Sequence, residues 1–175
     1  PAPRPEAEED GRRQRSNRSR EQIVHAMIDL IRAGEMTPAA ARVAEKAKVG
    51  LRTVFRHFEE MDTLNQEISA IVAAEILPLV EKPFEGPTWR AQLEELLERR
   101  AHIYERVMPL KIAGSLQRFR SKFLMEDYLR FLKMERAGLK RVLPPKIMND
   151  AVLFHAIEMA VGFQTWRRLR QDQNL

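Results

Sequence analysis

The sequence predicts an all-α protein, and three observations carry that prediction. Apolar residues recur at helical spacing along most of the chain, no segment alternates with period two for long, and the breaks between apolar stretches hold proline, glycine and helix-capping residues. With 175 residues, of which 44% are hydrophobic and 31% charged, the chain is long and apolar enough for a packed core in one domain or two small ones.

The N-terminal segment predicts an arm followed by a helix. Residues 1–18 are rich in Pro, Glu and Arg with almost nothing apolar, so we expect a disordered basic arm that lacks the apolar stretch of a secretory signal. Ser19 is a good N-cap, and Gln22 completes a capping box. Gly34 stands where a helix ends, so a helix is predicted over 19–33.

Residues 37–58 predict two short helices joined by a tight turn. Thr37 followed by Pro38 indicates an N-cap and the first turn of a helix. Gly50 breaks the pattern, and a second short helix with a polar, basic face follows over 51–58. This arrangement predicts a helix-turn-helix, which places its second helix in the DNA major groove.

The rest of the chain predicts further helices, at about 63–81, 89–107, 110–116, 118–142 and 147–170. Asp62 and Thr88 are the expected N-caps of the first two. Pro78 is expected to kink or fray the first helix, and Pro109 to interrupt the second. The last helix is apolar on most sides, which predicts that it is buried, either within a monomer or partly in an interface between chains. No apolar run approaches the roughly 20 residues that span a bilayer.

Positive charge is concentrated toward one end of the chain. The net charge of +5 and the pI of about 9.8 allow a polyanionic partner. Residues 11–20 hold five arginines and no acid, and residues 42–57 hold five basic residues against Glu45 alone. A charge run is ordinarily a solvated surface. One of these runs precedes the helix-turn-helix pattern and the other lies inside it, so we interpret both as phosphate-facing.

The string VAEKAKVGLRTVFRHFEEMDTL, residues 43–64, resembles the DNA-binding domain of the TetR/AcrR family of bacterial transcriptional regulators. The matching positions are Val43, Ala44, Ala47, Val49, Thr53, Val54, Phe55, His57, Phe58 and Leu64. The resemblance covers about residues 19–70 and implies a three-helix DNA-binding domain over 19–62. Residues 63–175 are then expected to form a C-terminal helical effector-binding and dimerisation domain, which many relatives extend by one more helix.

Three positions depart from the family pattern. Lys48 stands where the family has its turn glycine, so the turn must form without a positive φ or the lysine must accept strain of about 1 kcal/mol. Gly50 replaces the usual serine. Met61 replaces the lysine that meets a phosphate in the family, so this contact is in doubt and Lys48 or the arginine arm is expected to compensate.

The residues of the motif fall into two sets, those that pack the two helices together and those that face outward. The first set is expected to be Val43, Ala44, Ala47, Val49, Val54 and Phe58, and the outward-facing set is Leu51, Arg52, Thr53, Arg56 and His57. The candidate DNA-contacting residues are Arg18, Lys48, Leu51, Arg52, Thr53, Phe55, Arg56 and His57. The resemblance implies that Thr53, Phe55 and His57 touch the DNA backbone. The resemblance also makes Leu51, Arg52 and Arg56 candidates for contact with bases or nearby phosphates, and an arginine can bind guanine bidentately.

The C-terminal residues hold candidates for an effector chamber. These are Tyr104, Met108, Phe119, Phe123, Met125, Tyr128 and Phe163, with His102 and His155 as sources of polar contacts. Aromatic residues and methionine at helical spacing are also ordinary core residues, and this alternative stays open. Such a lining favours a small, largely apolar effector over a highly charged one.

The resulting hypothesis is a cytoplasmic, nucleoid-associated bacterial transcriptional regulator, most often a repressor in this family. It binds a palindromic double-stranded DNA operator as a homodimer, with recognition helices about 34–36 Å apart, and a small apolar effector releases it. No cofactor or membrane is implied. The chain has no cysteine, and its four scattered histidines offer no metal spacing. A hydrolase would need a paired base and nucleophile, and the sequence offers no such pair, so an enzyme is not predicted. The alternative is a DNA-binding or adaptor protein of the same fold without an effector.

Overall fold

The computed structural model describes residues 6–59 and 61–175, and this part of the chain is helical without any strand. The predicted all-α class is confirmed. The helices are α1 (Glu6–Arg32), α2 (Ala40–Ala47), α3 (Leu51–Phe58), α4 (Met61–Glu81), α5 (Trp89–Gln117), α6 (Lys122–Val142), α7 (Pro145–Met148), α8 (Ala151–Ala160) and α9 (Phe163–Arg167), followed by a π-helical turn η1 (Arg168–Asp172).

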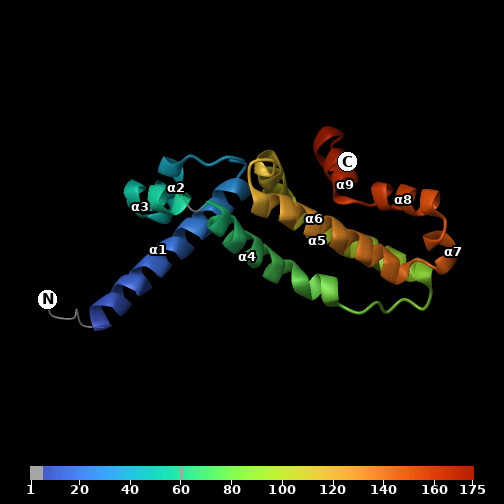
Figure 1. Ribbon diagram of the computed structural model, residues 1–175. Helices are drawn as coiled ribbons and strands as arrows, with labels where there is room; N and C mark the ends of the chain where they lie inside the picture. The colour runs from blue at the N-terminus through green and yellow to red at the C-terminus, as the bar shows by residue number, and fades with distance from the viewer. Residues whose placement is uncertain (1–5, 60) are drawn as a thin grey trace.

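The short helices α2 and α3 lie at one end of the molecule, and the long helices extend from them toward the other (Figure 1). Helix α1 packs on α2 and α3 and also contacts α4 and α5. Helices α5 and α6 form a long antiparallel pair that α4 contacts on both members. At the far end α7 turns the chain back, and α8 and α9 return along the pair (Figure 1). The chain therefore places its N-terminal helices and its C-terminal segment against one central bundle.

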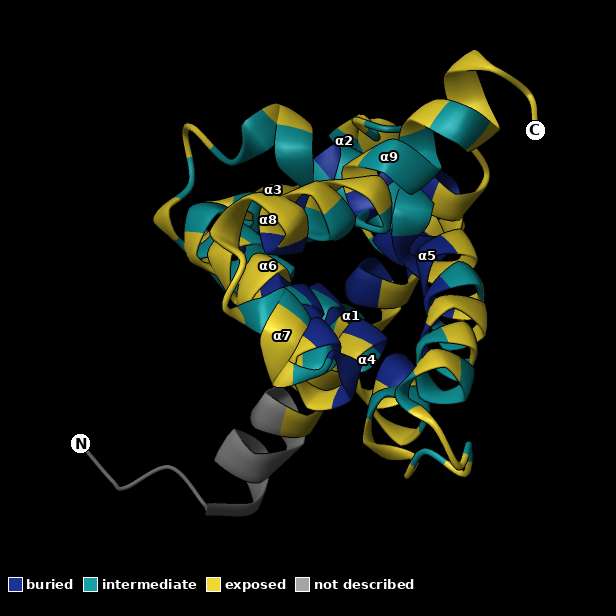
Figure 2. Ribbon diagram, turned by 90° about the vertical axis from the view of Figure 1, so that its right-hand side faces the viewer, coloured by how far each residue is buried: buried dark blue, intermediate teal, exposed yellow. Residues whose placement is uncertain are grey.

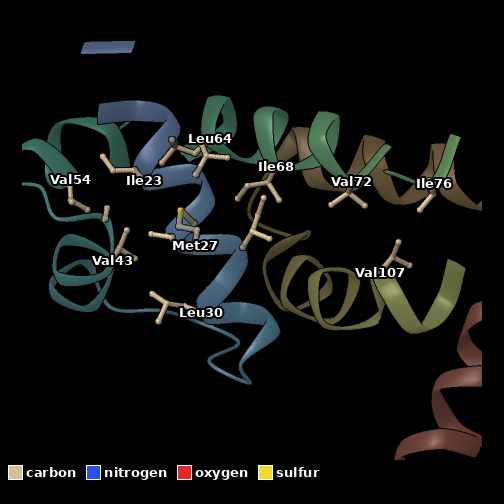
Figure 3. Close-up of a cluster of buried hydrophobic side chains, with 14 of the residues drawn as sticks. Ile23, Met27, Leu30, Val43, Val54, Leu64, Ile68, Val72, Ile76 and Val107 are labelled. Atoms are coloured by element: carbon tan, nitrogen blue, oxygen red, sulfur yellow. The ribbon is translucent and has the colours of Figure 1, made fainter. Parts of the chain in front are cut away.

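One buried apolar cluster joins the small N-terminal helices to the long ones. Figure 3 shows Val43 of α2 and Val54 of α3 beside Ile23 of α1. The same cluster continues along one face of α4, through the buried side chains of Leu64, Ile68, Val72 and Ile76. The division into domains at residues 62 and 63 stays a prediction, since this cluster runs across it. A second cluster, which includes Leu96, Leu139 and Phe154, closes the far end.

Helix α1 starts earlier than the sequence predicts. It begins at Glu6, so the expected arm over 1–18 is wrong from residue 6 onward, while residues 1–5 lie outside the described part of the chain. The early residues are mostly Glu, Ala, Arg and Gln, which have high helix propensity. A segment with few apolar residues cannot pack in a core, but it can still be helical because its residues favour the helix.

The ends of the first two helices follow different rules. Gly34 ends α1 with a φ of 103°, a left-handed conformation that glycine adopts freely, as the sequence predicts. The main-chain N–H of Gly34 donates to the carbonyl of Ile31 at 3.0 Å. The prediction that Thr37 caps α2 is wrong, because α2 begins at Ala40 after Ala39 and has no side-chain cap.

Helix α5 continues through Pro109, so the predicted break into 89–107 and 110–116 is wrong. A proline removes one main-chain N–H from the helix. Val107 and Ala113, on either side of it, are buried against neighbouring helices, and this packing outweighs the lost hydrogen bond. At the start of α5 the Thr88 hydroxyl accepts from the N–H of Ala91 at 3.3 Å, which confirms the predicted cap.

The predicted final helix over 147–170 is divided into α7, α8 and α9. The Asp150 carboxylate accepts from the N–H of Leu153 at 3.0 Å and so starts α8 as a new helix. Gly162 then caps α9. Asp62 is also placed differently from expectation: it lies in the first turn of α4 and accepts the Ser121 hydroxyl at 2.6 Å. For α8 and α9, Asp150 and Gly162 thus stand at the positions where a new helix begins.

Candidate functional site

Helix α3 presents one continuous side to solvent. Successive residues of an α-helix are about 100° apart, so positions 51, 52, 55 and 56 share one side. The structure confirms this arrangement, because the side chains of Leu51, Arg52, Phe55 and Arg56 are all exposed. We call these four residues the outer face of α3. Two arginines and two apolar side chains therefore project together from a helix at the end of the molecule.

His57 is not part of the outer face. Only 8% of its surface is exposed, so the prediction that it faces outward is wrong. His57 follows Val54 by three residues, which places both on the same side of the helix, and Val54 is fully buried. Thr53 is half-buried at the edge of the outer face, and Phe58 is half-buried against the core. Contact between His57 and a DNA backbone is therefore not available from this geometry.

The turn between α2 and α3 forms with Lys48 in the left-handed conformation, at φ 55° and ψ 41°. Its N–H donates to the carbonyl of Glu45 at 3.2 Å, and the N–H of Val49 donates to the carbonyl of Ala44 at 3.1 Å. These two bonds are the Schellman pattern, which glycine usually closes. Lysine thus accepts backbone strain of about 1 kcal/mol here. Its side chain is exposed and lines a hollow between α1 and α2.

The other two departures from the family pattern have simple structural readings. Gly50 is the N-cap of α3 with a φ of −67°, so this position does not need a glycine. Its carbonyl accepts from the N–H of Thr53 at 2.9 Å. Met61 starts α4, is half-buried and packs against the core. The place where the family has a phosphate-binding lysine is therefore occupied by an apolar packing residue.

Several basic residues near this end of the molecule lack partners. Within the described part of the chain, Arg52 and Arg56 make no ion pair or side-chain hydrogen bond. Arg18 and Lys48 line a shallow hollow of about 390 Å³ between α1 and α2, together with Lys46. Lys46 is paired with Asp29 at 3.4 Å. Arg18, Lys46 and Lys48 share this hollow with the acidic residues Glu21 and Asp29.

Arg42, from the same basic run, is committed to the protein itself. Its guanidinium bonds Glu35 at 3.2 Å and Glu45 at 2.6 Å. The hydrogen bonds to Glu35 and Glu45 raise the pKa of Arg42 above its ordinary value. Arg42 therefore differs from Lys48, Arg52 and Arg56, which are exposed without such pairing in the described part of the chain, and the interpretation of residues 42–57 as phosphate-facing stays a prediction.

A cavity of about 330 Å³ lies among α1, α4, α5, α6 and α9. Of the seven predicted chamber residues, Tyr128 and Phe163 line it. The other five do not, and Phe119 is 77% exposed. The polar part of the lining includes Asn65, Ser69, Lys111, Arg118, Asp127, Glu135 and Arg167. The cavity is therefore more polar than the predicted set implies.

A buried polar network stands beside the cavity. The Tyr104 hydroxyl and the main-chain N–H of Phe163 both donate to one carboxylate oxygen of Glu135. Arg100 donates to the carbonyl oxygens of Val161 and of Glu135. Burial raises the pKa of the Tyr104 hydroxyl far above its ordinary value. The network fastens the α8–α9 corner to α5 and α6.

Sequence reasoning missed this network, although a pattern in the sequence indicates it. Arg100 stands in the buried stripe of α5 between Leu96 and Tyr104, and Glu135 stands between Phe131 and Leu139 on α6, always four residues apart. A charged residue within an apolar stripe is buried only when it is paired or hydrogen-bonded. Such residues therefore mark positions where a buried network is to be expected.

Asp127 holds a second polar cluster in the cavity wall. Its carboxylate accepts one hydrogen bond from the Lys111 ammonium at 2.7 Å and another from the Ser69 hydroxyl at 2.7 Å. Burial acts to raise the pKa of this carboxyl, but the Lys111 charge, the two hydrogen bonds and Arg130 together hold the pKa below its ordinary value. The cluster thus joins α4, α5 and α6 through an ionised carboxylate.

Helix α4 is long and apolar enough to cross a membrane by length and composition alone, contrary to the expectation that no such run exists. Four of its apolar side chains pack in the core. Among the described residues no three His, Cys, Asp or Glu side chains gather as a metal site. Comparison with family models, curated proteins and solved structures finds no match to this chain.

Proposed function

We propose that this protein is a sequence-specific DNA-binding transcriptional regulator of the TetR/AcrR kind, in which α2 and α3 act as the helix-turn-helix. The observation that carries the proposal is the outer face of α3. It projects Arg52 and Arg56 without partners in the described part of the chain, directly after a turn that exposes Lys48. Unpaired cations on an exposed helix suit a polyanion.

The proposed docking places α3 in the major groove. That groove is about 12 Å wide and admits an α-helix of about 10–12 Å diameter. Arg52 and Arg56 then reach base edges or nearby phosphates, and the exposed Phe55 makes apolar contact. Lys48 and Arg18, which line the same hollow between α1 and α2, neutralise phosphates on the groove wall. They stand in for the lysine that Met61 replaces.

The exposed apolar side chains of α8 support a homodimer. Val152 is 81% exposed and Met159 is 76% exposed, with Leu153 also exposed between them in the chain. Figure 2 shows most of α8 in the colour of exposed residues. Exposed apolar patches mark association surfaces, and a two-fold pair of chains offers the same patch twice. Two α3 helices about 34–36 Å apart would then meet successive major grooves.

The cavity supports regulation by a small effector. It touches Met27 and Ile31 of α1 and Met61 and Ile68 of α4, so a ligand there contacts helices that pack on α2 and α3. A ligand favouring one arrangement of these helices shifts DNA affinity by its differential binding to the two arrangements. The alternative, an adaptor of the same fold without an effector, is favoured by a bundle without a cavity, and the cavity of about 330 Å³ weighs against it.

Selection of duplexes from a random DNA pool by the purified protein, followed by sequencing, tests the proposal. We expect a palindromic site and an affinity that falls steeply with salt, because several phosphates are neutralised. Arg52→Ala and Arg56→Ala should each weaken binding to that site by about 5- to 150-fold, the range for one bidentate base contact. Thr53→Ala should weaken binding less.

Arg106→Ala is the matched control, since Arg106 is an exposed arginine of α5, remote in sequence from the motif. It should leave DNA affinity unchanged, and circular dichroism should show all variants folded. No preference for any sequence over random duplex, or equal affinities of the Arg52, Arg56 and Arg106 variants, would refute the proposal.

A further inference from the structure

We propose that the cavity binds an amphipathic organic anion, an apolar body with one terminal oxyanion such as a carboxylate, and that Arg118 and Arg167 receive the anionic end. Both arginines line the cavity, one at the end of α5 and the other at the end of α9. The binding itself is independent of DNA, while its role as an effector rests on the proposed function.

The two arginines are left without anionic partners inside the protein. The Nε atom of each is buried and has no hydrogen-bond partner. Within the described part of the chain, no carboxylate pairs with either guanidinium. A buried donor without an acceptor is costly, and the guanidinium fork matches a carboxylate geometrically. A bound oxyanion supplies the acceptors that these donors lack.

The other charged side chains in the cavity wall already have hydrogen-bond partners inside the protein. Lys111 is paired with Asp127 at 2.7 Å. Glu135 receives the Tyr104 hydroxyl and the Phe163 N–H, the latter at 2.8 Å. Among the lining residues, three are cationic and two are anionic, so one net positive charge remains on the wall. A neutral ligand leaves this charge unmatched, and a monoanion balances it.

The remainder of the lining suits an apolar body. Its apolar members include Met27, Ile68, Val72, Phe131 and Phe163. The volume of about 330 Å³ is near the lower end of the range of about 300–1,000 Å³ for small-molecule pockets. The ligand class is therefore a compact alkyl or aromatic acid.

Aromatic contacts hold Arg118 in place before any ligand arrives. Its guanidinium carbon lies 4.2 Å from the ring centroid of Tyr128 and 4.8 Å from that of Phe119. Such stacking lowers the entropy lost when the guanidinium binds an anion.

The test uses two fluorescent probes with the same ring system, the anionic 1-anilinonaphthalene-8-sulfonate and the uncharged N-phenyl-1-naphthylamine. The full chain should bind the anionic probe about tenfold or more tightly than the neutral one. Decanoate should displace the anionic probe, and 1-decanol at the same concentration should not. Arg118→Gln and Arg167→Gln should each lower the affinity for the anionic probe about tenfold and change the affinity for the neutral probe by no more than about twofold. Arg106→Gln is the control and should change neither.

The neutral probe separates a lost charge contact from a lost cavity, because a variant that no longer folds binds neither probe as the native protein does. Arg118→Lys, which keeps the charge, should retain part of the preference for the anion. Equal affinity for both probes in the native protein, no binding of either, or unchanged binding of the anionic probe by both Gln variants would overturn the proposal. Since no DNA is present, failed operator selection would refute the proposed function and leave this result standing.

Discussion

The Tyr104 hydroxyl donates to Glu135 in the interior of the bundle, and the same carboxylate oxygen accepts the main-chain N–H of Phe163 at 2.8 Å. Tyr104 lies on α5, Glu135 on α6 and Phe163 at the start of α9. One oxygen atom thus joins three helices that are distant in sequence. Glu135 also lines the cavity, so this junction forms part of the cavity wall.

Tyr104→Phe should destabilise the protein by about 1.5–3 kcal/mol, because it removes a hydrogen bond to a buried carboxylate and leaves that acceptor less satisfied. Urea denaturation measures the change. Tyr128→Phe is the matched control: the Tyr128 hydroxyl makes no hydrogen bond within the described part of the chain, and the change should stay within about 0.5 kcal/mol. Equal stability of the two variants would contradict a stabilising role for the Tyr104 bond.

Lys48→Gly should raise stability by about 1 kcal/mol, because glycine adopts the left-handed conformation of this turn without strain. Lys48→Ala removes the same charge and keeps the strain, so it should not be stabilised. Thermal or urea denaturation distinguishes the two. If Lys48 neutralises a phosphate, both variants should lose the same DNA affinity, and the slope of log affinity against log salt should fall by about 0.9. A stability gain in the alanine variant would show that charge rather than backbone strain is responsible.

Asp127→Asn should destabilise the protein by about 1–3 kcal/mol at neutral pH, because Lys111 loses a half-buried charged partner. The pKa of Asp127 is lowered in the folded protein, so its contribution is complete above the ordinary aspartate pKa of about 3.9 and is lost as the pH falls through the folded value. The native protein should therefore keep its advantage over the variant above about pH 5 and lose it progressively in denaturation series that continue toward about pH 1. Asp172→Asn, at an exposed carboxylate of η1, is the control and should keep the native pH profile.

Gly86→Ala should destabilise the protein by about 1–3 kcal/mol, the range for overpacking. A Cβ atom there would lie 2.8 Å from the Cβ of Ala91 and 2.9 Å from the main-chain nitrogen of Gln92. Gly114→Ala is the contrasting change, since its Cβ would meet Leu124 at 3.6 Å in the interior of α5. It should stabilise by about 0.5–1 kcal/mol, the difference in helix propensity. Differential scanning calorimetry should show shifts of opposite sign, and shifts of one sign would refute the account.

Val152→Glu and Met159→Glu should each convert a dimer into monomers, because a charge placed in an apolar interface is left without a partner. Analytical ultracentrifugation at several concentrations measures the dissociation. Leu116→Glu is the control, as Leu116 is an exposed apolar residue of α5, and it should leave the association constant unchanged. If the native protein sediments as a monomer at all concentrations, the exposed apolar side chains of α8 do not form a dimer interface.

The sequence predicts the architecture better than the details of the surface. Helical spacing and caps identify α3 and the start of α5 correctly, because these depend on local chemistry at residues such as Gly50 and Thr88. The orientation of His57 was also accessible, since its spacing from Val54 puts it on the buried side. Pro109 behaved otherwise, because tertiary packing around α5 overrides a local helix-breaking tendency.

The cavity could not be predicted from composition in the same way. Its lining comes from five helices that are distant in sequence, and only the fold brings Met27 beside Arg118 and Arg167. The chemistry of aromatic residues such as Tyr104 suits the wall of a ligand chamber, but it suits a core equally well. Which of the two a residue serves depends on the tertiary arrangement.

The apolar cluster that links Val43, Val54 and the buried face of α4 has a consequence for how the molecule unfolds. A helix pair whose apolar contacts are made on a long helix loses them when that helix unfolds, and it must break the same contacts to open by itself. The end of the molecule that carries α3 therefore belongs to the same cooperative unit as α4 and α5. Amide hydrogens of α3 should exchange with solvent mainly through opening of that whole unit, rather than by local fraying of a small independent module.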